Sequence, residues 1–205
     1  MKRIVWLAIL SLALPVAAFA GSTTIDYTNH GGTLTGSDAG LTLTGSLLVA
    51  VAPFAGDPDG IDGKLGTVSF STGAYVSTSG NVATFMGGSG TSFTIAGNGS
   101  DGLPNGTIFS GSFTGPVTLT FKGTLSNGGN IYQLVGTLNG TLNGQQAAGM
   151  TFETYVFSGV NGWMGTSQTG SGDTFLAPVP EPGTLGLLGT GLVGLAGVIR
   201  KKFKA

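Results

Sequence analysis

The sequence contains no cysteine and little charge. Of its 205 residues, none is cysteine, one is histidine and only 8% are charged. Without cysteine, disulfide bonds and thiol chemistry are excluded. One histidine and no cysteine also cannot supply the usual ligand set of a zinc site. The fold must therefore be held together by its hydrophobic core and its hydrogen bonds.

The few charges divide sharply between the ends and the middle of the chain. Six of the eight basic residues lie near the two termini, which leaves Lys64 and Lys122 for the segment 21–178. That segment holds eight acidic residues and has a formal charge of −6. Nucleic-acid binding depends on Lys and Arg contacts to phosphate. We therefore expect no nucleic-acid partner.

The body of the chain also lacks sustained helical periodicity. Apolar, β-prone runs alternate with clusters of Gly, Asn, Asp and Ser, which is typical of strands joined by turns. Asn127-Gly128 lies between two such runs and predicts a hairpin. We expect one all-β domain of roughly eight to ten short strands, an antiparallel β-sandwich or jelly roll. The strongest predicted strands are 41–51, 66–71, 82–86, 92–96, 117–122, 131–138 and 150–157.

The N-terminus has the three parts of a signal peptide in the expected order. Two basic residues follow Met1, an apolar run comes next, and Ala18 and Ala20 provide small residues at a cleavage site. The sequence therefore predicts a signal peptide over residues 1–20, removed by signal peptidase, with Gly21 beginning the exported chain.

The C-terminus ends in a charge-free apolar stretch followed by cations. A transmembrane helix is predicted over about 184–199, near the lower limit of length needed to cross a bilayer. Terminal cations do not cross the membrane, so they should remain cytoplasmic and leave the body outside. The residues that would stop translocation are Arg200, Lys201 and Lys202, with Lys204 beyond them.

A short motif precedes that apolar stretch. It consists of Val179, Pro180, Glu181 and Pro182. The motif, the Gly/Leu-rich span and the basic end together resemble the PEP-CTERM sorting signal of Gram-negative bacteria, a tail also catalogued as an ice-binding protein C-terminal domain. The resemblance implies that residues 178–205 are recognised by an exosortase, a membrane transpeptidase-like enzyme that would cut near Pro-Glu-Pro. It also implies an association with exopolysaccharide and biofilm genes. A plain membrane anchor that no enzyme processes is the alternative.

One loop in the body is dense in carboxylates. Asp57, Asp59 and Asp62 lie within six positions, in a loop that glycines allow to fold sharply. Three carboxylates at this spacing could surround Ca²⁺. The spacing departs from that of an EF-hand loop, and Asp-Pro and Asp-Gly are ordinary turn formers. A solvated turn is therefore expected, with calcium as the alternative, and no other metal or cofactor is predicted.

Three further residues have side chains that could take part in catalysis or binding. His30 is flanked by two glycines, and no Gly-x-Ser-x-Gly motif accompanies it, so a surface turn is expected. Glu153 shares a strand face with Thr151 and Tyr155 and is expected to be solvent-exposed. Trp163 could stack on a sugar ring, although a tryptophan that covers the end of a β core is more common.

The sequence thus predicts an exported cell-surface or extracellular-matrix protein. Its body, residues 21–177, is expected to be a non-enzymatic structural module. The alternative is an adhesion module that binds carbohydrate or calcium, with exopolysaccharide as the partner. A secreted hydrolase is a third hypothesis. The protein would be anchored in the inner membrane before processing and then reach the cell surface or the medium.

Overall fold

The computed structural model describes residues 24–53, 60–157, 162–179 and Gly191. Residues Thr23–Pro178 form one compact unit. Within the described residues, no helix has both the length and the apolar character that crossing a membrane requires. The predicted signal peptide lies outside the described residues, as does the predicted transmembrane helix apart from Gly191.

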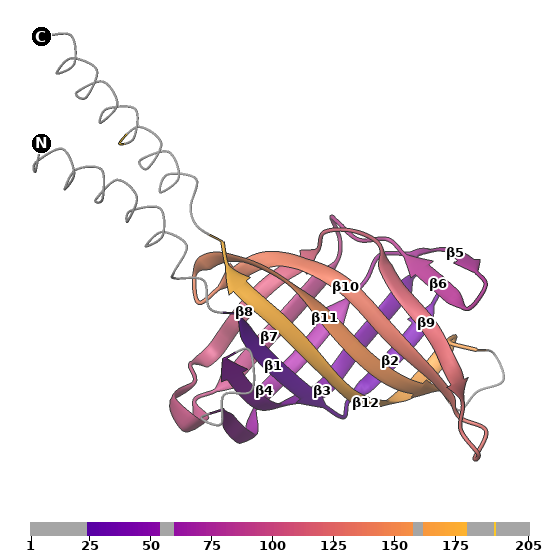
Figure 1. Cartoon of the computed structure of the whole chain (residues 1–205), viewed down its shortest axis with the longest axis horizontal. Helices are drawn as coiled ribbons and strands as arrows, with labels where there is room; N and C mark the ends of the chain where they lie inside the picture. The colour runs from indigo at the N-terminus through magenta and orange to yellow at the C-terminus, as the bar shows by residue number, and fades with distance from the viewer. Residues whose placement is uncertain (1–23, 54–59, 158–161, 180–190, 192–205) are drawn as a thin grey trace, which may run out of the picture. The chain divides into compact units, whose positions relative to one another are not determined.

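The compact unit is built from antiparallel strands, and this confirms the all-β prediction (Figure 1). A short 3-10 turn, η1, covers Ser100–Gly102. The strands of the described residues are β1 (Ile25–His30), β2 (Thr33–Ser37), β3 (Gly40–Pro53), β4 (Ile61–Ser71), β5 (Tyr75–Ser79), β6 (Val82–Phe85), β7 (Ser92–Asn98), β8 (Asn105–Phe113), β9 (Val117–Thr124), β10 (Asn130–Leu142), β11 (Gln145–Phe157) and β12 (Gly165–Pro178).

The sheet closes on itself, so the prediction of a sandwich or jelly roll is wrong. Strand pairing runs from β3 through β4, β7, β8, β10, β11, β12 and β1 and returns to β3. The fold is therefore an antiparallel β-barrel. Alternation of apolar and polar residues is the same in a sandwich and in a barrel, since both bury one face of each strand. Only the pairing of strands far apart in sequence distinguishes them.

Strands β1 and β2 together occupy one position in the barrel wall. Both lie between β3 and β12. Strand β1 pairs with one part of each of these two strands, and β2 pairs with another part of each. The break between them falls at Gly31 and Gly32, whose φ angles of 72° and 90° favour glycine. A side chain at Gly32 would also lie 2.6 Å from the backbone nitrogen of Ser46. The break therefore requires glycine.

A second irregularity positions the candidate site. The first part of β10 pairs with β9 and its last part pairs with β8, so the sheet forks along β10. Strand β9 pairs with β6, and β6 pairs with β5. Strands β5 and β6 form an extension beside the barrel (Figure 1). The predicted hairpin between β9 and β10 is confirmed, with Gly128 at a φ of 85° in its turn.

The barrel is filled by large apolar side chains. Phe93 stands at the centre of a ring cluster, with Phe70 stacked on it and Phe109 and Phe113 edge-on to it, at centroid separations of 5.7–6.2 Å. These rings come from three neighbouring strands, β4, β7 and β8, and all are essentially buried. Rings in such arrangements contribute to stability beyond their area burial, so this cluster strengthens the core beneath these three strands.

Candidate functional site

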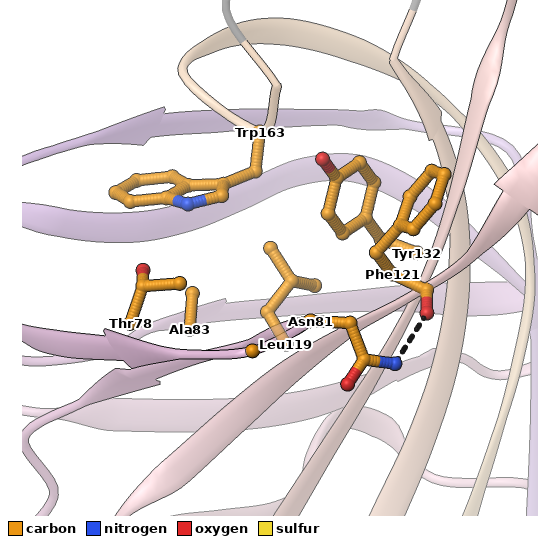
Figure 2. A pocket seen from close by; sticks show the side chains of 8 residues that line it. Thr78, Asn81, Ala83, Leu119, Phe121, Tyr132 and Trp163 are labelled. Carbon is orange, nitrogen blue, oxygen red and sulfur yellow. Dashed lines mark hydrogen bonds between the residues drawn. The ribbon is translucent and has the colours of Figure 1, made fainter.

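A pocket of about 300 Å³ opens beside the β5–β6 extension. Its walls come from β5, β6, β9, β10 and the loop that precedes β12. The lining residues are Thr78, Gly80, Asn81, Ala83, Leu119, Phe121, Tyr132 and Trp163. Figure 2 shows the indole of Trp163 over Thr78, Ala83 and Leu119, with the rings of Phe121 and Tyr132 as a side wall. The pocket therefore combines aromatic faces with a few polar groups.

Trp163 both caps the core and forms the roof of this pocket. Its ring centroid lies 4.9 Å from that of Phe85 and 5.2 Å from that of Tyr75. Gly36 of β2 lies against its backbone, where any side chain would overlap. With only 9% of its surface exposed, the tryptophan covers the end of the β core as expected. The packing around it fixes the orientation of the indole.

The side wall of the pocket is equally well supported. The rings of Phe121 and Tyr132 lie 5.5 Å apart, and Tyr132 meets Phe157 edge-on at the same separation. Asn81 donates a hydrogen bond of 3.0 Å from Nδ2 to the backbone oxygen of Phe121 (Figure 2). This bond fixes the Asn81 amide at the edge of the pocket.

A second cluster of polar side chains lies inside the barrel wall, around Glu153. Its Oε2 accepts hydrogen bonds from Asn29 Nδ2 at 3.0 Å and from the Tyr155 hydroxyl at 3.2 Å. Its Oε1 accepts one from Thr151 Oγ1 at 3.3 Å. The carboxyl lies over Gly172 of β12, where a methyl group would overlap it. Burial raises the pKa of Glu153 to about 7, although the three hydrogen bonds act in the opposite direction.

The prediction that Glu153 is solvent-exposed is wrong, because its side chain is 0% exposed. The face shared by Thr151, Glu153 and Tyr155 points into the barrel, and the face with Phe152 points outward. Phe152 lies on the outer surface against Phe175, with their ring centroids 6.1 Å apart. Three hydrogen bonds satisfy the buried carboxyl, which is why this strand can place its polar face inside.

A pair of acidic residues lies on the outer surface of the same wall. Asp173 of β12 accepts a hydrogen bond of 3.0 Å from Thr28 Oγ1. Asp26, two residues before Thr28 on β1, is partly buried. Burial, with a smaller effect from the charge of Asp173, raises the pKa of Asp26 to about 6. Two carboxyl groups make this part of the surface acidic at neutral pH.

The sequence-predicted calcium loop is only partly described. Asp62 is exposed on β4, opposite Ala50 of β3, whereas Asp57 and Asp59 lie outside the described residues. Among the residues that the structure places, no group of three acidic or histidine side chains could hold a metal ion. His30 is exposed at the end of β1. The structure thus does not test the expectation of a solvated turn, or its alternative of a calcium site.

The predicted processing sites lie almost wholly beyond the described part of the chain. Val179 follows β12 and is 45% exposed. The other predicted residues of the sorting motif, the membrane stop and the signal cleavage site are outside the described residues, namely Pro180, Glu181, Pro182, Arg200, Lys201, Lys202, Ala18, Ala20 and Gly21.

Sequence reasoning identified Trp163 but missed its partners in the pocket. Asn81, Phe121 and Tyr132 come from different parts of the chain, and pairing of β6 with β9 and of β9 with β10 brings them together. Ser79-Gly80-Asn81 does carry a turn signal in the sequence. That signal marks a hairpin end but does not indicate which aromatic residues will lie beside it.

Comparisons with known proteins identify the tail. Residues 178–201 match the family model described as the PEP-CTERM protein-sorting motif. Searches of curated proteins and of solved structures returned no significant match. The matched segment contains Val179, Pro180, Glu181 and Pro182 and extends to Lys201. By this sorting signal the chain is a PEP-CTERM protein, an exported substrate of an exosortase.

Proposed function

We propose that the barrel is a non-enzymatic surface module that binds carbohydrate in the pocket roofed by Trp163. The observation that carries this proposal is the pocket lining, in which an indole and two further aromatic rings surround a few polar groups. The C–H faces of a sugar ring pack on aromatic faces, and its hydroxyl groups need hydrogen-bonding partners at the rim. An exported protein meets polysaccharide at the cell surface, which agrees with the sorting signal.

The position of Glu153 supports a binding role over hydrolysis. Glycoside hydrolysis uses two carboxyl groups on either side of the scissile bond. Glu153 is the only glutamate of the segment 21–178, and its carboxyl is buried and hydrogen-bonded inside the barrel. It therefore does not face the pocket, and none of the described residues that line the pocket carries a carboxylate.

The proposal is tested by the fluorescence of Trp163 in the full chain. The sequence has two tryptophans, so Trp6→Phe leaves Trp163 as the only one. The protein should be kept in a zwitterionic detergent, because sugar-headed detergents would compete for the site. Binding of a glycan from an array of surface polysaccharides should change the emission of Trp163 in a saturable way.

A matched pair of variants separates the pocket from the rest of the barrel. Phe121 and Phe152 are both half-buried phenylalanines, but only Phe121 lines the pocket. Phe121→Ala should weaken glycan binding by roughly tenfold, in line with the loss of one aromatic contact. Phe152→Ala should leave it unchanged. An array with no bound glycan, or equal losses in both variants, would contradict the proposal.

A further inference from the structure

The described residues that line the Trp163 pocket include no side chain that is charged at neutral pH. Its eight residues include no Asp, Glu, Lys, Arg or His. Tyr132 is its only titratable group, and burial raises the pKa of Tyr132 above the ordinary value of 10.0. The phenol therefore stays neutral under physiological conditions. A bound group that carried a charge would lose hydration here without gaining a counter-ion, which is strongly unfavourable.

The polar groups of the lining are suited to hydroxyl groups. Asn81, which lines the pocket, uses Nδ2 to hold the oxygen of Phe121, so its Oδ1 is left as an acceptor. Thr78 Oγ1 accepts a hydrogen bond of 2.9 Å from Tyr75, which leaves its own hydroxyl hydrogen as a donor. The hydroxyl of Tyr132 makes no hydrogen bond to any described residue and can donate or accept. The pocket thus presents both donors and acceptors.

The volume of the pocket limits the ligand to a small group. At about 300 Å³, it lies at the lower end of the range for small-molecule sites. A single sugar ring matches a space of this size better than an extended oligosaccharide does. The body also carries a formal charge of −6, which lowers the local concentration of polyanions.

Resting on the proposed function, we propose that the site takes one uncharged pyranose residue and discriminates against uronic acids and sulfated sugars. The apolar face of the ring lies against the aromatic side chains of the pocket, and its hydroxyl groups reach the polar rim. Asn81 is the residue that determines this specificity, because its amide is held in one orientation by Phe121 and carries no charge. Thr78 and Tyr132 supply the remaining hydrogen-bonding groups.

The test compares two sets of polysaccharides on the full chain carrying Trp6→Phe, in zwitterionic detergent. The neutral set is dextran, laminarin and mannan, and the acidic set is alginate, polygalacturonate and heparin. Binding is followed by Trp163 fluorescence at low salt and at 0.5 M salt. We expect at least one neutral polymer to bind with little dependence on salt, and the acidic polymers to leave the emission unchanged.

Two asparagine variants test the assignment to Asn81. Asn81→Ala should weaken binding of the neutral polymer by roughly three- to tenfold, the effect of losing one or two neutral hydrogen bonds. Asn98→Ala is the matched control, because Asn98 is also exposed and donates from Nδ2 to a backbone oxygen, that of Lys64, at 2.6 Å. It lies outside the pocket lining and should bind as the parent does.

Each other outcome overturns a defined part of the account. Saturable binding of an acidic polymer that Phe121→Ala weakens would overturn the neutral-sugar inference but leave carbohydrate binding standing. Binding of a neutral polymer to the parent and to Asn81→Ala with equal affinity would overturn the role of Asn81. Failure of every glycan, acidic or neutral, to change the emission of Trp163 would overturn both the inference and the proposed function.

Discussion

Removing the charge of Glu153 should change how the stability of the barrel depends on pH. Burial raises the pKa of Glu153 from 4.5 to about 7 in the folded state. The unfolded chain therefore releases this proton near pH 4.5, whereas the folded chain keeps it until about pH 7. Between these values the folded state binds more protons, so the free energy of unfolding falls as the pH rises. This contribution is fully present below pH 4.5 and is lost once the pH passes the folded pKa.

The size of the effect follows from the shift in pKa. A shift from 4.5 to about 7 corresponds to roughly 3 kcal/mol, since one pKa unit is equivalent to 1.36 kcal/mol. Glutamine has nearly the shape of a protonated glutamate and no charge. Glu153→Gln should therefore unfold like the parent at pH 4.5 and be more stable than the parent at pH 8, by up to about 3 kcal/mol.

The assay is urea unfolding of the compact unit over pH 4.5–8. With a slope of about 2 kcal/mol per molar urea, Glu153 should contribute up to about 1.5 M to the fall of the parent midpoint across this range. Glu153→Gln should remove that contribution, most clearly between pH 6 and 8. Asp26 is the control, because burial also raises its pKa, to about 6, but it is only partly buried on the outer surface. Asp26→Asn should therefore reduce the fall below about pH 6 and leave the fall between pH 6 and 8 unchanged. Parallel profiles for the parent and Glu153→Gln would refute the assignment to Glu153.

Three other predictions follow from specific residues. Gly172→Ala should destabilise the barrel by about 1–3 kcal/mol, because the added methyl group would overlap the Glu153 carboxyl. In urea unfolding, the double variant Gly172→Ala with Glu153→Ala should lose less stability than the sum of the two single losses. Full additivity would contradict this contact. Glu181→Ala should block processing in a host with the matching exosortase, so that the unprocessed chain accumulates in the inner membrane; equal sizes of parent and variant on a gel would instead indicate a simple anchor. Calcium should raise the melting temperature of the parent little, and a large rise that Asp59→Ala abolishes would show that the Asp57–Asp62 loop is a calcium site.

The sequence predicts the strands of this protein much better than the closure of the sheet into a barrel. Alternation in segments such as 117–122 and 131–138 depends only on which residues face the core, and those segments lie within β9 and β10. Closure depends on pairing between β1, near the N-terminus, and β12, near the end of the body. No local pattern records such a pairing, because its partners are separated by most of the chain. The number of strands was underestimated for a related reason, since short strands such as β2 and β5 carry weak signals.

The interior of the barrel shows why the Glu153 prediction failed. Alternation in β11 identifies two faces but does not say which one is buried when Phe152 and Val156 stand on one and Tyr155 on the other. Hydrophobicity favours burying the phenylalanine face. Asn29 of β1 donates a hydrogen bond to Glu153, which allows the face with Glu153 to be buried instead. Asn29 lies close to Glu153 only because the barrel closes. The pocket was missed for the same reason, because its lining is assembled from distant strands.

The central claim is that the pocket beneath Trp163 holds a sugar. The most direct measurement is a crystal structure of the protein soaked with an oligosaccharide of whichever neutral polymer binds. The account predicts density for one pyranose ring in this pocket, in contact with an aromatic face and within hydrogen-bonding distance of Asn81. A saccharide bound elsewhere on the barrel, with the Trp163 pocket containing only water, would contradict it.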